Sequence, residues 1–189
     1  HMKTEFIAVF LPMKHGWSNI AVIDMTPLLD HLHVTVRDLK RAERFYDQFL
    51  PLLGFDLRYK EYDRKEANAY EIIEYHHAAF SIGIVSPRSC FEKEKLSRRK
   101  PGALHHVAFM VDDTQTVDRL YEQVLQMKMQ IVHAPRFYPE YCEDYYAFFL
   151  KDSEGIELEI TCYDRQKYFP YISGDTENSR HGSWSKWIW

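Results

Sequence analysis

The chain of 189 residues has 46% hydrophobic and 28% charged residues, a formal net charge of −4 at pH 7 and a pI near 6.2. A chain of this length folds as one domain or as two small half-domains that share a core. The slightly acidic balance gives no sign of the strongly basic face that nucleic-acid partners require, so we expect no nucleic-acid binding.

Residues 1–27 are predicted to be an N-terminal extension that begins with a tag scar, His1-Met2. Its longest apolar run, Phe6–Leu11, is far too short to span a membrane, and no export cleavage site follows it. The three cysteines are an odd number without CxxC spacing, which argues against a disulfide framework and a structural zinc site. We therefore expect a cytoplasmic protein with no membrane partner.

The chain contains an internal duplication. When the sequence is shifted by 75 positions, His31–Leu50 aligns with His106–Leu125 without a gap. Seven of the twenty aligned residues are identical, whereas average residue usage gives about one identity by chance. The sequence therefore predicts two copies of one structural module.

Each copy begins with a strand that leads into an amphipathic helix. In the first copy, apolar residues alternate over Leu32–Val36 and then recur at helical spacing over Ala42–Phe49. The second copy repeats this change of period over Val107–Val124. Asp38 and Asp113 precede the two helices at the position where an N-cap residue is favoured.

Three strand-like runs follow each helix. They are Phe55–Tyr62, Ala69–Tyr75 and Ala79–Val85 in the first copy, and Met129–His133, Tyr145–Leu150 and Ile156–Cys162 in the second. Each copy therefore reads as a βαβββ module. The predicted fold class is α+β, with two tandem βαβββ modules that form a curved mixed sheet around a central cleft.

The domain is predicted to span residues 28–163. Module 1 covers residues 28–86, a polar linker covers 87–102, and module 2 covers 103–163. Residues 164–189 form a C-terminal tail. We expect the two modules to close the cleft within one chain, and the chain to form a homodimer in addition.

Strand alternation places three potential metal ligands on one face. In each opening strand the apolar residues pack under the helix, which leaves His31 and His106 on the opposite face, at equivalent positions of the repeat. The same alternation in the last strand puts Glu159 on that face. Two imidazoles and one carboxylate suit one divalent ion, Fe, Mn, Ni, Zn or Co, that keeps open positions for a substrate.

Alternatives to this ligand set stay open. Each histidine can instead be a hydrogen-bonded residue of the sheet, with Glu159 a solvated charge. Glu157 lies on the same face and competes with Glu159 as the ligand. The equivalent positions of the two histidines favour the metal site.

His33 and Tyr146 are the predicted catalytic residues. His33 shares the face of His31, where it is either a proton donor or a hydrogen-bonded neighbour. Tyr146 belongs to a tyrosine-rich run, FYPEYCEDYYAFF. This run either covers the cleft and orients a substrate oxygen or packs in an edge strand and loop.

Residues 29–163 resemble the vicinal oxygen chelate superfamily in three segments, DHLHVTVRDLKRAERFY, HHVAFMVDD and YYAFFLKDSEGIELEIT. This superfamily includes glyoxalase I, fosfomycin-resistance thiol transferases, extradiol dioxygenases and bleomycin-binding proteins. The resemblance implies a glyoxalase-like fold and places His31, His106 and Glu159 on the family's metal-ligand positions.

The sequence departs from the family pattern at two places. The four-ligand isomerases carry a carboxylate in the last strand of the first module, where this chain aligns Gly83. The ligand set therefore looks more like that of the thiol transferases and dioxygenases. In the last hairpin, Asp152-Ser153-Glu154-Gly155 stands where Asp-Pro-Asp-Gly is usual, and Gly155 supplies the positive φ of the turn.

The resemblance implies a divalent-metal-dependent enzyme that acts on a small molecule with vicinal oxygens, as an isomerase or lyase, a thiol transferase or a ring-cleaving dioxygenase. The alternative is a non-catalytic protein of the bleomycin-resistance type that sequesters a small molecule. The intact set of two histidines and a glutamate favours the enzyme, whereas Gly83 and the aromatic content favour the binding protein. The sequence has no GxGxxG, P-loop or GxSxG motif, which argues against dinucleotide-binding dehydrogenases, P-loop NTPases and α/β-hydrolases.

Overall fold

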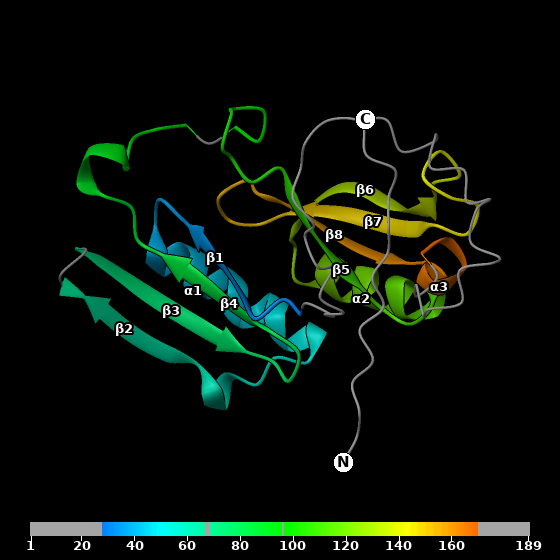
Figure 1. The fold of residues 1–189 in the computed structure, drawn as a ribbon, viewed down its shortest axis with the longest axis horizontal. Helices are drawn as coiled ribbons and strands as arrows, with labels where there is room; N and C mark the ends of the chain where they lie inside the picture. The colour runs from blue at the N-terminus through cyan, green and yellow to red at the C-terminus, as the bar shows by residue number, and fades with distance from the viewer. Residues whose placement is uncertain (1–27, 67–68, 96, 170–189) are drawn as a thin grey trace, which may run out of the picture.

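The computed structural model describes residues 28–66, 69–95 and 97–169, which contain both predicted modules (Figure 1). Module 1 contains β1 (His31–Thr35), α1 (Leu39–Phe49), β2 (Glu61–Lys65), β3 (Tyr70–His76) and β4 (Ser81–Val85). Module 2 contains β5 (His106–Met110), α2 (Thr114–Gln126), β6 (Gln130–Phe137), β7 (Tyr146–Lys151) and β8 (Glu157–Cys162), followed by α3 (Arg165–Tyr168). The repeated βαβββ order is confirmed. The predicted N-terminal extension and residues 170–189 of the predicted tail lie outside the described residues.

Both long helices begin where the sequence predicts. The side chain of Asp38 accepts a hydrogen bond from the backbone N–H of Arg41 at 2.9 Å, and Asp113 accepts one from Thr116 at 2.7 Å. These bonds satisfy N–H groups that lack a partner within the first helical turn. In the part of the chain that the structure describes, no helix is long and apolar enough to cross a membrane.

Each module folds into its own four-stranded sheet, with the strand orders β1-β4-β3-β2 and β5-β8-β7-β6. The first and last strands of each module are parallel neighbours and the other pairs are antiparallel, so both sheets are mixed. The α+β fold is confirmed, with its strands divided over two sheets. β1 and β5 are edge strands, and each leaves one edge unpaired among the described strands.

The second strand of module 1 begins later than predicted. The run Phe55–Tyr62 reads as a strand, but Leu57–Tyr59 forms a 3-10 turn and β2 starts at Glu61. Asp56 explains the difference, because its side chain accepts a hydrogen bond from the backbone N–H of Arg58 at 2.9 Å and caps this turn.

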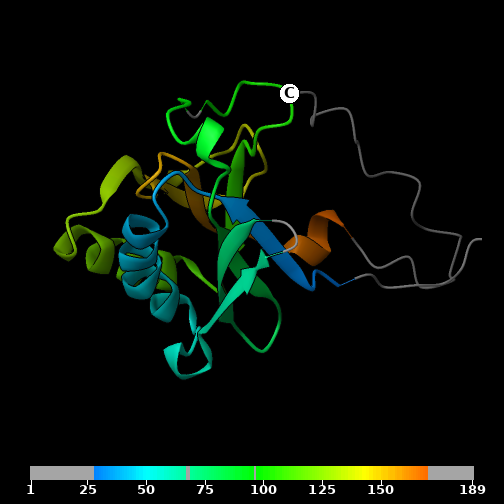
Figure 2. The ribbon, with the colours of Figure 1, turned by 90° about the vertical axis from the view of Figure 1, so that its left-hand side faces the viewer.

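The two modules share one hydrophobic core. Figure 2 shows α1 and α2 next to each other on one side of the molecule, with the strands on the other. Phe109 of β5 contacts Phe49 of α1 and Phe80 of the β3–β4 turn, with ring centroids 6.0 and 6.3 Å apart. Buried side chains of both modules form a single cluster. The sheet faces that no helix covers are therefore the ones available to the predicted metal ligands.

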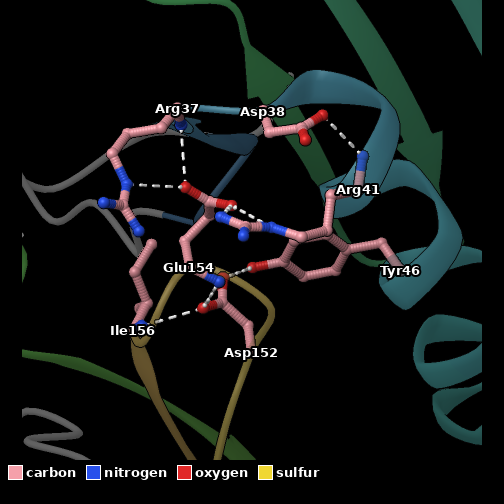
Figure 3. Close-up of polar contacts among 7 residues, drawn as sticks. All are labelled: Arg37, Asp38, Arg41, Tyr46, Asp152, Glu154 and Ile156. Carbon is pink, nitrogen blue, oxygen red and sulfur yellow. Dashed lines mark hydrogen bonds and ion pairs between the residues drawn. The ribbon is translucent and has the colours of Figure 1, made fainter. Parts of the chain in front are cut away.

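A buried carboxylate joins the modules at the β7–β8 turn (Figure 3). Glu154 of this turn has a fully buried side chain that accepts hydrogen bonds from the backbone N–H and the side chain of Arg37, at 2.9 and 3.3 Å. Its other oxygen accepts a hydrogen bond from Nε of Arg41 at 3.0 Å. Beside it, the hydroxyl of Tyr46 donates to Asp152 at 2.9 Å. This Glu154 cluster ties the turn before β8 to the start of α1.

Candidate metal centre

Glu159 lies on the central strand β8, with its carboxylate on the face away from the helices. Its neighbours Leu158 and Ile160 point into the core, as strand alternation predicts. Only 3% of Glu159 is exposed, and Oε1 accepts a hydrogen bond from the hydroxyl of Tyr145 at 2.6 Å. Burial raises the pKa of Glu159, and the nearby charge of Glu157 adds to the increase. The site thus holds a buried carboxylate that has no Lys or Arg partner among the described residues.

His106 of the edge strand β5 is the neighbour of this carboxylate. Residues 106 and 157 are paired in register, so His106 lies diagonally across from Glu159, and its Nε2 is 3.5 Å from Oε2. Burial lowers the pKa of His106, and the neighbouring His105 contributes in the same direction. A neutral imidazole is the form of histidine that binds a metal ion. The pair therefore offers one nitrogen and one carboxylate oxygen to a cation.

Glu157, the competing candidate, is occupied by another partner. Its Oε1 forms an ion pair with Nη1 of Arg98, which belongs to the segment between the modules. Arg98 therefore neutralises Glu157 and places a guanidinium group close to His106. This arrangement favours Glu159 over Glu157 as the residue available to a metal ion.

His31 and His33 lie on β1, in the other sheet. Nδ1 of His31 is 2.7 Å from Oδ2 of Asp30, and the side chain of His31 is 53% exposed. The rings of His31 and His33 are 4.5 Å apart. Among residues 28–66, 69–95 and 97–169, no group of three or more His, Cys, Asp or Glu residues is arranged to hold a metal ion. Among the described residues of a single chain, His106 and Glu159 thus lie together, but His31 does not complete a group of three with them.

The imidazole of His33 covers Gly83 of the neighbouring strand. His33, Gly83 and Glu74 lie side by side on β1, β4 and β3. Nε2 of His33 is 3.1 Å from Oε1 of Glu74, and a Cβ atom on Gly83 would lie 2.5 Å from Cδ2 of His33. Sequence reasoning did not identify Glu74, which needed the strand register. His33 is a hydrogen-bonded neighbour, as one of its two interpretations states, and it stays a candidate for proton transfer.

Tyr146 does not lie with these residues. Its hydroxyl donates to Asp118 of α2 at 2.9 Å, and its ring packs against the main core. Successive residues of a strand point to opposite faces, so the preceding Tyr145 points to the Glu159 side instead. We therefore replace Tyr146 by Tyr145 as the tyrosine of the site.

Aromatic rings surround the Glu159 side of module 2. Tyr145 stacks on Tyr163 with centroids 5.1 Å apart, and meets Tyr141 edge to face at 5.2 Å. Tyr138 stacks on Tyr141 at 5.6 Å and contacts Phe149 at 5.5 Å. This second, small core lies on the face opposite the helices. It gives the carboxylate an apolar, aromatic surrounding.

The comparisons with known proteins agree with this architecture. The model of the Glyoxalase/Bleomycin resistance protein/Dioxygenase superfamily matches residues 28–160. An uncharacterized protein of Bacillus subtilis, YqjT, is 26% identical over 132 residues, which are 70% of this chain and 96% of that protein.

Two solved structures illustrate the likeness in fold. A glyoxylase/bleomycin resistance protein/dioxygenase domain from Frankia sp. EAN1pec aligns with a TM-score of 0.59 and 18% identity, over 74% of this chain and 100% of that one. The fosfomycin resistance protein FosX from Listeria monocytogenes, solved with Mn(II) and sulfate, aligns with a TM-score of 0.50 and 15% identity, over 74% and 95% of the two chains. With its two βαβββ modules and a family match over most of its length, the chain belongs to the glyoxalase/bleomycin resistance protein/dioxygenase superfamily.

Proposed function

We propose that the protein is a divalent-metal-dependent enzyme that acts on a small molecule with two adjacent oxygens, and that His31, His106 and Glu159 hold the metal ion. The observation that carries this proposal is the pair formed by the buried Glu159 and the partly buried His106, 3.5 Å apart and without a Lys or Arg ion-pair partner among the described residues. A buried carboxylate without a cation is unfavourable. A divalent ion would compensate its charge and bind the imidazole nitrogen, so these residues fit a metal ion.

We further propose that His31 joins this pair from a second copy of the chain. His31 lies on an edge strand and is half-exposed, and the other two ligands lie on β5 and β8. Since β5 is also an edge strand, the free edges of β1 and β5 can meet in a homodimer. Such a dimer would contain two equivalent sites, each with residues from both copies.

The side chains around the site have separate roles in this proposal. A divalent ion bound there would polarise a substrate oxygen. Tyr145 orients Glu159 through its hydrogen bond of 2.6 Å. His33, held by Glu74, is the group that would accept or donate a proton. This arrangement suits an isomerase or lyase, a thiol transferase or a ring-cleaving dioxygenase.

Metal titration tests the ligand set. Isothermal titration of metal-free protein with Mn²⁺, the ion held by FosX, and then with Fe²⁺, Ni²⁺, Zn²⁺ and Co²⁺ should show one site per chain. Glu159→Gln, His106→Gln and His31→Gln should each abolish the site. The matched controls Glu157→Gln and His76→Gln should retain it. Absence of binding for all five ions, or equal binding in all variants, would reject the metal site.

A mixing experiment tests whether the site is shared between copies. In a heterodimer of His31→Gln and Glu159→Gln chains, one site keeps all three ligands and the other loses two. When equal amounts are refolded together, half of the dimers are heterodimers, so about a quarter of all sites should recover. If no metal binding recovers, either all three ligands come from one chain or His31 is not a ligand.

The aromatic surroundings of Glu159 favour a second candidate, a non-catalytic protein that sequesters a small molecule. Tyr138 has a buried hydroxyl without a hydrogen-bond partner in the described structure, and it packs in the aromatic cluster beside the carboxylate. A ligand that stacks on these rings would need no metal ion. Retention of one tightly bound small molecule by metal-free protein, seen by native mass spectrometry, would favour this candidate.

A further inference from the structure

A cavity of about 430 Å³ lies between the two modules, outside the candidate metal centre. One wall comes from α1, and the others come from residues 127–130, between the end of α2 and the start of β6, and residues 151–153, from the end of β7 into the β7–β8 turn. Figure 3 shows this turn packed next to α1. The volume lies within the usual range of small-molecule pockets, about 300–1,000 Å³.

The charged residues that line the cavity are mostly cationic. Arg44, Lys128 and Lys151 contribute three positive charges, and none of them has an ion-pair partner in the described part of the chain. Asp152 contributes the single negative charge of the lining residues. Its oxygens already accept hydrogen bonds from Tyr46 and from the backbone N–H groups of residues 154 and 156. The lining therefore has a net charge of +2, from three positive charges and one negative charge, in a chain whose overall charge is −4.

One of these cations is held at an unfavourable backbone position. Lys128 follows α2 with a φ of 56°, in the left-handed region that favours glycine. Its N–H donates to the carbonyl of Leu125 at 2.9 Å, and the N–H of Met129 donates to that of Val124 at 3.1 Å. These two bonds form a Schellman motif, in which glycine is the usual residue at this position.

Module 1 has glycine at the corresponding position of its own Schellman motif, which ends the 3-10 turn Leu50–Leu53 after α1. Gly54 has a φ of 88°, its N–H donates to the carbonyl of Pro51 at 3.1 Å, and the N–H of Phe55 donates to that of Leu50 at 3.2 Å. The duplicated module therefore forms the same motif with the less strained residue. A strained residue that lies beside a cavity is a reason to look for a ligand.

The opposite wall contains a polar group that lacks a partner. The hydroxyl of Ser153 is buried and has no hydrogen-bond partner among the described residues. Such a group costs free energy unless it meets an acceptor or donor. Phe45, Met127 and Met129 add apolar surface to the same cavity.

We propose that this cavity binds a small organic anion, a phosphate ester or carboxylate with an apolar body. Arg44, Lys128 and Lys151 would neutralise the anionic group, and the hydroxyl of Ser153 would donate a hydrogen bond to it. The apolar body would contact Phe45 and the two methionines. The ligand would touch both modules, and the site does not depend on the proposed metal centre.

Phenyl phosphate is the probe that tests this site. Isothermal titration of the full chain in low salt should show one site per chain, with an affinity that falls as salt screens the charges. Lys128→Gly should weaken binding about tenfold, which corresponds to about 1.4 kcal/mol. The same variant should unfold at a higher temperature, because glycine relieves the backbone strain. Arg44→Gln should weaken binding similarly, and the control Lys93→Gln, which removes a charge elsewhere, should not.

The opposite results would overturn the proposal. Equal affinity in Lys128→Gly, Arg44→Gln and Lys93→Gln, or no binding of phenyl phosphate at millimolar concentration, would show that the cavity does not recognise anions. Inorganic phosphate that bound as tightly as phenyl phosphate would contradict the role of the apolar wall. Glu159→Gln should bind phenyl phosphate like the wild type, and a loss there would place the probe at the metal centre instead.

Discussion

Replacing Glu154 by glutamine should weaken the contact between the two modules. The side chain of Glu154 is fully buried, whereas those of Arg37 and Arg41 are 35% and 42% exposed. Glutamine has nearly the same size, but its amide group presents two N–H donors to arginines that are themselves donors. One guanidinium would therefore lose its acceptor.

The magnitude follows from the burial of the pair. Removing one member of a fully buried ion pair costs about 3–5 kcal/mol, because the remaining charge is left uncompensated. Both arginines reach water here and can be rehydrated, which reduces the cost. We expect Glu154→Gln to lower the free energy of unfolding by about 2–3 kcal/mol.

Urea unfolding followed by circular dichroism measures this loss. Glu140→Gln is the matched control, since it removes the partner of Arg136 from a pair at 3.1 Å whose side chains are about half-exposed. An exposed pair of this kind contributes about 0.5 kcal/mol or less. Equal losses in the two variants would refute the argument that burial makes the Glu154 cluster important for stability.

Three further substitutions give distinct expectations. Gly83→Ala places a Cβ 2.5 Å from the ring of His33. Urea unfolding should show a free energy of unfolding that is lower by about 1 kcal/mol. Alanine in a strand is usually more stable than glycine, and such a stabilisation here would contradict the close contact. Tyr145→Phe removes the hydrogen bond to Glu159 and should weaken Mn²⁺ binding about tenfold in isothermal titration, so an unchanged affinity would argue against the role of the phenol. Burial raises the pKa of Asp152 in the folded protein. The folded state therefore favours the protonated carboxyl group, and this stabilisation is present below the ordinary pKa and is lost as the pH rises through the raised value. Wild type should therefore lose stability relative to Asp152→Asn from about pH 4 upward, and a difference in unfolding free energy that does not change with pH would contradict this.

The sequence predicts the two modules and the face of each ligand because both depend on short-range patterns. Alternation within a strand determines which residues face the helices, so Glu159 and His106 lie on the face expected for them. The repeat predicts that their strands are equivalent to β4 and β1. The tyrosine-rich run did not indicate which tyrosine lies near Glu159, because Tyr145 and Tyr146 are adjacent and point to opposite faces, and either ring fits an apolar environment.

Longer-range features could not be predicted in the same way. Glu74 contacts His33 across Gly83, and that contact depends on the register of three strands from separate parts of module 1. The separation of His31 from the His106–Glu159 pair depends on how the two sheets pack around their shared core. Neither the length nor the composition of the segment between the modules determines that packing, so the sequence does not determine where His31 lies relative to this pair.

The two modules differ at one pair of facing positions in their first and last strands, in which strand carries the large side chain and which the small one. In module 2, Ala108 of the first strand lies beside Glu159 of the last, whereas in module 1 His33 lies beside Gly83. Each pair combines one functional side chain with one small residue, and a Cβ on Gly83 would already meet the ring of His33. A carboxylate at position 83 is therefore incompatible with the present position of His33. A substitution that places a carboxylate at position 83 would therefore also require a smaller residue at position 33.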